Sequence, residues 1–142
     1  MRRAPIFDTA ESVEEAFYDA VQRGDLPGMM ALWSTDDEVV CVHPGGARLV
    51  GLAAIRGAWE GIFANGGITV RPCRVVVHTG AVTAVHSLVE QIAVSSPIGN
   101  QVVECPVTNV YVKTGLGWRI VLHHGSPGGE VQTAAPADAV LH

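Results

Sequence analysis

From residue 68 onward the apolar residues recur with a period of two, and this pattern limits the fold more than any other feature of the sequence. Side chains of a β-strand point alternately to the two faces of a sheet, so a period of two predicts strands. Short segments with turn-forming residues interrupt the pattern, which makes consecutive strands antiparallel neighbours. Four long strands are predicted, over residues 68–78, 81–95, 101–113 and 118–126.

The first half of the chain predicts helices instead. Apolar residues in 9–23 recur at the spacing of one helix face, and Gly24 ends that helix in a left-handed cap. A short second helix begins at Asp25, and a third follows Gly51. Residues 39–50, between the second and third helices, are predicted to form two short strands joined by a turn. Helices followed by a long meander give an α+β fold, with the helices packed on a curved antiparallel sheet.

These elements fit one domain. A chain of 142 residues is long enough to bury a single core. We expect a loose N-terminal lead over residues 1–8, a single domain over 9–127, and a loose Gly-, Ala- and Pro-rich tail over 128–142.

Composition excludes several classes of function. The net charge is −5, and the nine Lys and Arg residues are scattered, which argues against nucleic-acid binding. No apolar run reaches the length of a membrane span, and the N-terminus lacks the apolar segment of a signal peptide. Three cysteines with apolar neighbours indicate reduced core residues. A cytoplasmic protein is expected.

The last strand changes from apolar to polar along one face. Residues of even number from Trp118 to Ser126 share that face, and it ends in His124 and Ser126. If Trp118 belongs to the core, His124 lies inside and His123 outside. A strand that becomes polar at one end is typical of the floor of a ligand pocket.

The order of elements and several motifs resemble the nuclear transport factor 2-like superfamily, over residues 9–127. The motifs are Gly24-Asp25-Leu26, His43-Pro44-Gly45-Gly46, Thr108-Asn109-Val110-Tyr111 and Trp118 through Pro127. The nearest branch is that of polyketide cyclases and ketosteroid isomerase. The resemblance implies a cone-shaped fold that encloses an apolar pocket for a small hydrophobic molecule. The same scaffold carries enzymes, binding modules and oligomerisation domains.

Comparison with ketosteroid isomerase implies roles for single residues. His43 occupies the position of that family's general base, and Asn109 that of its oxyanion-hole acid. Phe17 stands in place of its oxyanion-hole Tyr. Since one such donor commonly contributes about 3 kcal/mol, the missing hydroxyl argues against steroid isomerisation itself. Other isomerisations, cyclisations, dehydrations and hydrolyses remain compatible with the sequence.

If the protein is an enzyme, we expect His43 to act as base or acid, with Asn109 and His124 orienting the ligand or stabilising developing negative charge. A histidine bonded to a turn carbonyl is the equal alternative for His43. No cofactor is needed for this chemistry. The three side chains should converge on one cavity. If His43 faces solvent, or His124 lies on the convex side of the sheet, the acid–base hypothesis fails and a non-catalytic role is favoured.

The remaining wall of the pocket should be mainly aromatic. Glu90 shares a strand face with His86 and Leu88, so an inward Glu90 would be a carboxyl group with a raised pKa. The opposite face is hardly more polar, and we favour an ordinary surface or interface carboxylate. The expected pocket-lining residues are Phe17, Trp33, Trp59, Tyr111, Glu90 and Ser126.

Two further hypotheses concern metals and partners. Cys41, His43 and His124 form a metal set only if the fold gathers them, and without CxxC or HExxH motifs we predict no metal site. Residues 74–77 and 104–112 carry apolar side chains on both strand faces, which predicts a homodimer. The alternative function is a non-catalytic module that resembles the calcium/calmodulin-dependent kinase association domain, with its Trp-rich last strand and His-x-Ser ending.

Overall fold

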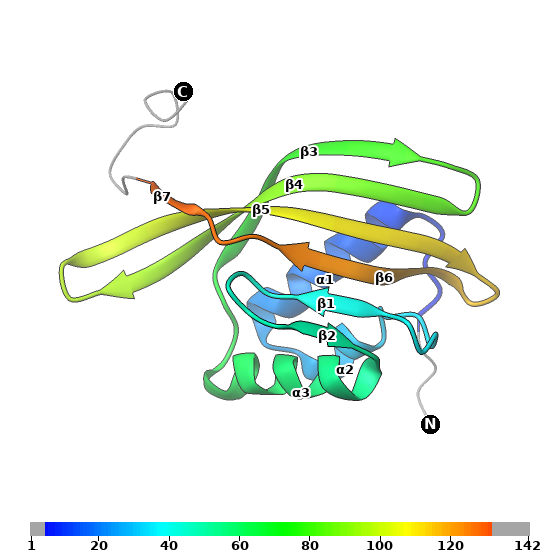
Figure 1. Cartoon of the computed structure of the whole chain (residues 1–142), viewed down its shortest axis with the longest axis horizontal. Coiled ribbons are helices and arrows are strands. Elements are labelled where there is room, and N and C mark those ends of the chain that lie inside the picture. Colours follow the sequence, from blue (N-terminus) through cyan, green and yellow to red (C-terminus); the bar gives the residue numbers. More distant parts are fainter. Residues whose placement is uncertain (1–4, 132–142) are drawn as a thin grey trace.

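The computed structural model describes residues 5–131, and its helices all pack against one face of a single open sheet (Figure 1). This confirms the α+β prediction. No helix in that part of the chain is long and apolar enough to cross a membrane. The helical elements are α1 (Ala10–Arg23), α2 (Leu26–Met30), α3 (Leu52–Ile62) and the 3-10 turn η1 (Phe63–Asn65).

The strands follow the spatial order β2-β1-β6-β5-β4-β3, and β7 pairs with β5 off this path. The four long strands are consecutive antiparallel neighbours, as predicted. However, β1 runs parallel to β6, so the sheet is mixed and the all-antiparallel prediction is wrong. No hairpin joins β1 to β6, and their direction was therefore not fixed by a turn. The strands are β1 (Val40–Val42), β2 (Arg48–Val50), β3 (Val70–Thr79), β4 (Thr83–Ser96), β5 (Gly99–Thr114), β6 (Gly117–Gly125) and β7 (Gly129–Val131).

Local signals in the sequence set the ends of α1. The Thr9 hydroxyl accepts a hydrogen bond from the backbone N–H of Ser12, which satisfies one of the free donors of the first turn. Gly24 ends the helix with a φ of 65°, a left-handed conformation that glycine adopts without strain. Asp25 then caps α2 through its side chain. The chain therefore turns sharply between α1 and α2, and α1 packs across the sheet.

The core lies between α1, α3 and the inner face of the sheet. Phe17 and Val13 of α1 and Ile55 of α3 are fully buried, and Leu88 and Ile120 meet them from the sheet. Each large apolar side chain buried in this way contributes about 1.5–3 kcal/mol. The apolar stripes predicted for the first and third helices are therefore the faces that hold the layers together.

Residues beyond both predicted domain ends make contacts with the domain. In the N-terminal lead, the Phe7 carbonyl accepts a hydrogen bond from the Trp118 N–H at 2.9 Å, and Arg119 donates to the Pro5 carbonyl at 3.0 Å. At the other end, β7 pairs with β5 beyond the predicted boundary at residue 127. Residues 1–4 and 132–142, the rest of the expected loose segments, lie outside the described residues.

A bulge in β6 reverses the orientation of the residues that follow it. Val110 of β5 pairs with Leu122, but the next residue, Tyr111, pairs with Ile120, so Val121 is an extra residue in β6. An extra residue shifts the alternation of side chains by one position. Consequently His123 is 2% exposed, whereas His124 is exposed. The prediction that His124 faces inward and His123 outward is wrong for this reason.

Candidate functional site

A set of hydrogen-bonded polar side chains, here called the polar network, lies in the core between α1 and strands β4, β5 and β6. Asn109 stands at its centre and has no exposed surface. Most groups in such surroundings must find partners, because an unpaired buried polar group costs free energy. The members are Glu14, Tyr18, His86, Glu90, Asn109, Tyr111 and His123.

The contacts of Asn109 fix the tautomer of His123. The Asn109 amide nitrogen lies 3.2 Å from the Tyr18 hydroxyl oxygen and 3.4 Å from Oε1 of Glu14, both of which accept its hydrogens. Its Oδ1 lies 2.6 Å from Nδ1 of His123. An amide oxygen only accepts, so Nδ1 of His123 carries the hydrogen. The other ring nitrogen, Nε2, is then left with a free lone pair.

Glu90 is a buried acid, 6% exposed, and not the surface carboxylate that we favoured from the sequence. Its oxygen Oε2 accepts a hydrogen bond from the Tyr18 hydroxyl at 2.8 Å. Burial raises the pKa of Glu90 to about 7, against the lowering effect of the Tyr18 hydrogen bond, and the Glu14 charge adds to the rise. Glu90 therefore gains and loses its proton near neutral pH.

His123 is a buried neutral imidazole beside this acid. Burial lowers its pKa to about 3, and the nearby His43 and His124 rings act in the same direction. Its Nε2 lies 3.9 Å from Oε2 of Glu90, too far for a direct hydrogen bond. A single oxygen atom could instead bond to both, since two contacts of about 2.8 Å can span that separation.

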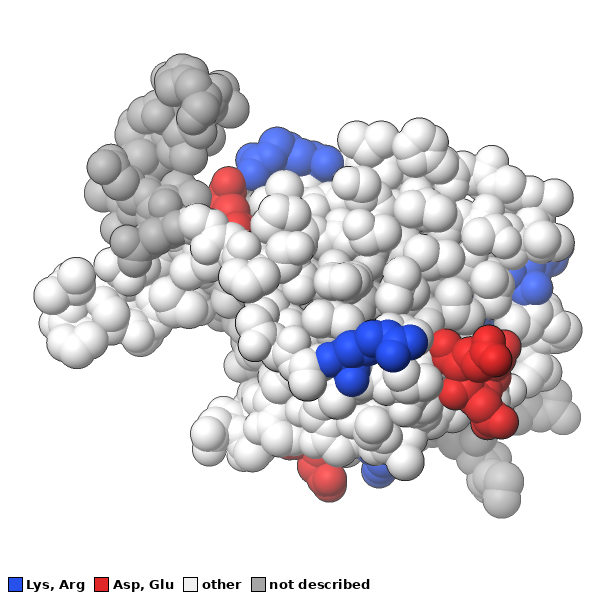
Figure 2. All heavy atoms as spheres, in the orientation of Figure 1, with Lys and Arg blue, Asp and Glu red and all other residues white. Residues whose placement is uncertain are grey.

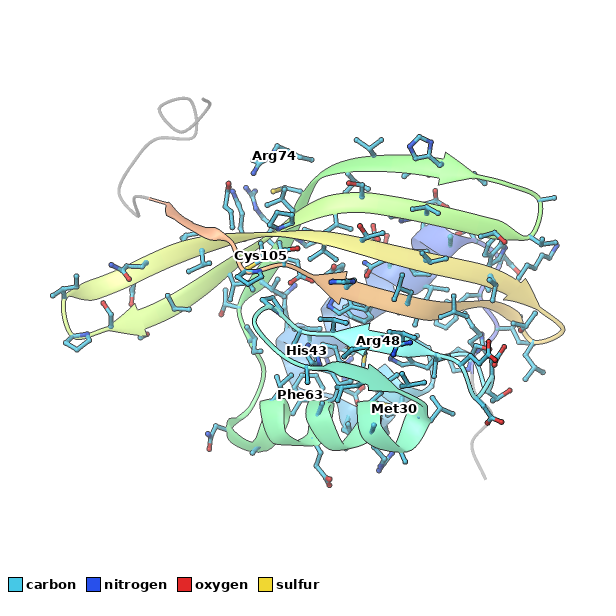
Figure 3. All side chains as sticks on the ribbon, in the orientation of Figure 1. Met30, His43, Arg48, Phe63, Arg74 and Cys105 are labelled. Carbon is cyan, nitrogen blue, oxygen red and sulfur yellow. The ribbon has the colours of Figure 1, made fainter. Side chains whose placement is uncertain are left out.

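His43 stands at the more accessible side of this pair. It follows β1 and is half-buried, and burial lowers its pKa. Its ring meets the Trp59 ring edge-on at 4.6 Å between centroids, and the His123 ring lies 6.0 Å away. Figure 3 shows His43 on the side of β1 and β2 nearer to the Phe63 end of α3. His43 and Asn109 thus approach His123 from two sides, while His124 takes no part.

Five of the six residues expected to line the pocket are buried, and one is exposed. Phe17, Trp33, Trp59, Tyr111 and Glu90 are buried, whereas Ser126 is exposed, because the bulge at Val121 also turns it outward. The Phe17 ring lies 4.9 Å from that of His123 and 5.6 Å from that of Trp59. The indole N–H groups of Trp33 and Trp59 are buried and find no hydrogen-bond partner within the described residues.

Several members of the polar network were missed from the sequence. Oε1 of Glu14 lies 2.7 Å from the Tyr111 hydroxyl and 2.9 Å from Nδ1 of His86, besides its contact with Asn109. Tyr18 lies one turn after Glu14 on the same helix face. Glu14 and Tyr18 are not among the residues that the sequence analysis singles out, and the family's tyrosine position was assigned to Phe17. The four-residue spacing of Glu14 and Tyr18 was the signal available.

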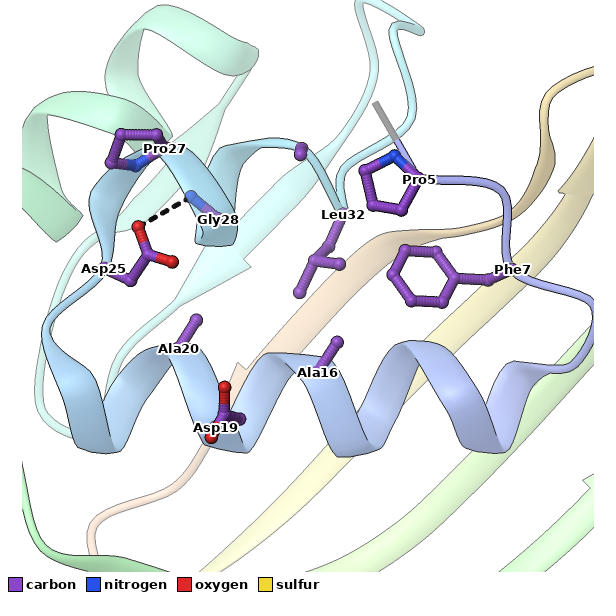
Figure 4. Close-up of a pocket in the computed structure, with 10 residues that line it drawn as sticks. Pro5, Phe7, Ala16, Asp19, Ala20, Asp25, Pro27, Gly28 and Leu32 are labelled. Carbon is purple, nitrogen blue, oxygen red and sulfur yellow. Dashed lines mark hydrogen bonds between the residues drawn. The ribbon is translucent and has the colours of Figure 1, made fainter. Parts of the chain in front are cut away.

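Two cavities are described, and neither is lined by His43, Asn109 or His123. The larger, of about 650 Å³, lies between α1, α2 and the N-terminal lead (Figure 4). It meets α1 at Ala16 and Ala20, about half a turn away from Glu14 and Tyr18. The smaller, of about 220 Å³, lies near Arg119.

The described residues contain no group of three or more His, Cys, Asp or Glu side chains placed to hold a metal ion. Sγ of Cys41 lies 3.5 Å from Nε2 of His43, but His124 is exposed on the other side of the sheet. The three-ligand set considered from the sequence therefore does not assemble. Burial raises the pKa of Cys41 to about 12, so the residue is a neutral thiol.

Comparison with known sequences and structures agrees with this fold. The sequence model of a family described as the SnoaL-like domain matches residues 10–129. None of the curated protein sequences compared with the chain matches it significantly.

Two solved structures illustrate the range of similar proteins. One, from Thiobacillus denitrificans, is provisionally assigned as a calcium/calmodulin-dependent protein kinase type II association domain. It is 35% identical to this chain with a TM-score of 0.78, and the match covers 88% of this chain and 99% of that one. The other, from Streptomyces avermitilis, is provisionally assigned as a dehydratase of the NTF2-like family; it is 29% identical, with a TM-score of 0.74, covering 82% of this chain and 92% of that one.

Proposed function

Since this chain belongs to the SnoaL-like domain family, we propose that it binds a small, apolar, ring-shaped molecule beside Trp59 and His43 and transfers a proton on it. The observation that carries the proposal is the pairing of Glu90 with His123. One is an acid with a pKa of about 7, and the other a base whose pKa is lowered to about 3, with 3.9 Å between their facing atoms. Titratable groups whose pKa values are driven apart by their surroundings are typical of acid–base sites.

Three groups divide the chemistry as follows. The lone pair of His43 accepts a proton from carbon, and protonated Glu90 donates one to the ligand oxygen. Neutral His123 is too weak a base for this step and orients the ligand through Nε2. In a dehydration the C–H and C–O bonds both break, a double bond forms, and the donated proton leaves in water. Isomerisation, cyclisation and hydrolysis need the same two proton transfers in other orders. The name given to the Streptomyces protein favours dehydration among these.

Trp59 supports the site as a place for a ligand. Its ring touches His43 and Phe17, and its buried N–H has no partner. A polar atom of the ligand would satisfy that donor, while the indole face covers an apolar ring. Half-buried His43 gives this site an accessible side.

The experiment measures proton transfer without knowledge of the natural substrate. The protein is mixed in D₂O with a panel of cyclic ketones and β-hydroxyketones, and NMR follows deuterium uptake and loss of water. We expect Glu90→Gln to slow the most reactive compound about 100-fold or more. Glu60→Gln, on the exposed face of α3, is the matched control and should leave the rate unchanged. Equal rates for both variants would refute the assignment of Glu90.

We also propose that the chain forms a homodimer through the outer face of its sheet. Val85 and Val110 lie opposite each other on that face, Val89 is nearby, and Val76 at the edge is 55% exposed. Figure 2 shows the centre of this side almost free of charged side chains. In the described part of the chain the helices lie on the inner face, so a second copy is the natural cover. The association-domain assignment of the Thiobacillus protein favours this view.

A further inference from the structure

The larger cavity, between α1, α2 and the N-terminal lead, has the size and the lining of a ligand site. Its volume of about 650 Å³ lies within the range of small-molecule pockets. Small side chains on α1 leave the space open, and Leu32 closes its base with only 2% of its surface exposed. It is lined by Pro5, Phe7, Ala16, Asp19, Ala20, Asp25, Pro27, Gly28, Ala31 and Leu32.

The two ends of this cavity differ in chemistry. Figure 4 shows Asp25 beside Gly28 and Pro27 at one end, and Pro5 with Phe7 at the other. The side chain of Asp25 uses Oδ1 to accept from the Gly28 N–H at 3.0 Å, which leaves its second oxygen available. Asp19 adds another carboxylate on the α1 wall. The cavity is therefore acidic at one end and apolar along the rest of its length.

Neighbouring charges give this difference a direction. Arg23 forms an ion pair with Asp19 at 3.1 Å on the exposed surface. The positive charge of Arg23 is therefore matched by Asp19, and the negative charge of Asp25 is not neutralised by it. The acidic end lies between the C-terminus of α1, where the helix dipole is negative, and the N-terminus of α2, which Asp25 caps. At the apolar end, the Arg119 guanidinium lies 5.9 Å from the centre of the Phe7 ring. A cation is thus attracted to the Asp25 end and repelled from the Phe7 end.

We propose that this cavity binds a small organic amine, with its ammonium group at Asp25 and its apolar part against Leu32, Phe7 and Pro5. The site is separate from the polar network, because Ala16 and Ala20 lie on the face of α1 opposite Glu14 and Tyr18. It therefore does not depend on the proposed function. The ammonium would form a charge-assisted hydrogen bond with the free Asp25 oxygen.

The test uses octylammonium as the probe, with octan-1-ol and octanoate as its neutral and anionic counterparts. Amide chemical shifts of the ¹⁵N-labelled full chain are followed during each titration. We expect octylammonium to bind with a dissociation constant of about 1 mM or tighter, as is usual for a ligand of this size. The shifts should centre on Ala16, Ala20, Gly28 and Leu32.

Variants separate charge from shape. Asp25→Asn keeps the capping ability of residue 25, since Asn is an equally good N-cap, but removes the charge. It should weaken octylammonium about threefold to fivefold and leave octan-1-ol unchanged. Ala16→Leu, which fills the cavity, should weaken both ligands. Asp37→Asn, an exposed substitution away from the cavity, is the control.

Three results would overturn the proposal. Octanoate could bind as tightly as octylammonium, Asp25→Asn could behave like Asp37→Asn, or the shifts could centre on Asn109 and His123 instead. The last result would place the amine in the polar network.

Discussion

Glu90 and His123 should have opposite effects on how the free energy of unfolding changes with pH. Burial raises the pKa of Glu90 from 4.5 to about 7 and lowers that of His123 from 6.5 to about 3. The folded state thus keeps a proton on Glu90 that the unfolded state releases, so stability is lost as pH rises from 4.5 to 7. It keeps His123 neutral where the unfolded state binds a proton, so stability is lost as pH falls from 6.5 to 3.

The size of each effect follows from linkage. A difference of one bound proton changes the free energy of unfolding by about 1.4 kcal/mol per pH unit. Between pH 4.5 and 6.5 the two contributions have opposite signs and nearly cancel in the natural protein. Replacing Glu90 by Gln removes only the Glu90 contribution, which lowers the free energy of unfolding as pH rises. Relative to the natural protein, Glu90→Gln should gain about 3 kcal/mol of stability between pH 4.5 and 7.

The assay is urea unfolding of the natural protein and its variants at half-unit steps from pH 4 to 7.5, with free energies from linear extrapolation. Glu60→Gln, on the surface, serves as control and should follow the natural protein. His123→Gln should change in the opposite direction, losing stability relative to the natural protein as pH rises from 4 to 6.5. If Glu90→Gln runs parallel to the natural protein over this range, Glu90 titrates like an exposed carboxyl and the acid–base proposal loses its basis.

The other predictions concern packing and assembly. Trp59→Ala should lower the free energy of unfolding by about 3–5 kcal/mol in denaturant melts, because Trp59 is 3% exposed and packs on Phe17 and Phe63. As a control, Arg56→Ala at an exposed position of the same helix should change that free energy by less than about 0.5 kcal/mol. Sedimentation at micromolar concentration should give about twice the 14.9 kDa of one chain, and Val85→Glu should shift it toward one chain. A single-chain mass for the natural protein would exclude the homodimer.

Periodicity was enough to predict the layout of the fold, because each change of period marks a change of element. The four long strands lie within a few residues of the predicted ranges. The partner of β1 was beyond reach, because a parallel pairing between distant segments leaves no local turn signal. It is this pairing that brings Val42 beside His124 and so carries His43 toward the site.

The candidate site was predictable only in part. Asn109 is buried together with Tyr111, two residues along β5, because no bulge interrupts the alternation between them. On β6 the same rule failed at one residue, because nothing in the run of apolar residues distinguishes Val121 as the one that bulges. His123 then takes the inner position expected for His124. The outward His124 overturns the acid–base hypothesis in the form built on that residue and favours the module alternative. The proposal made above rests on His123 instead.

Neighbouring residues of β4 show how both proposals can hold for one protein. Glu90 points into the polar network, and Val89 points to the outer face of the sheet. An assembly module needs only the outer face, and its interior would gain stability from apolar side chains in place of a buried acid and imidazole. A polar network beside an unpaired Trp59 N–H is better explained by a ligand in the interior, with dimerisation on the opposite face as a separate property.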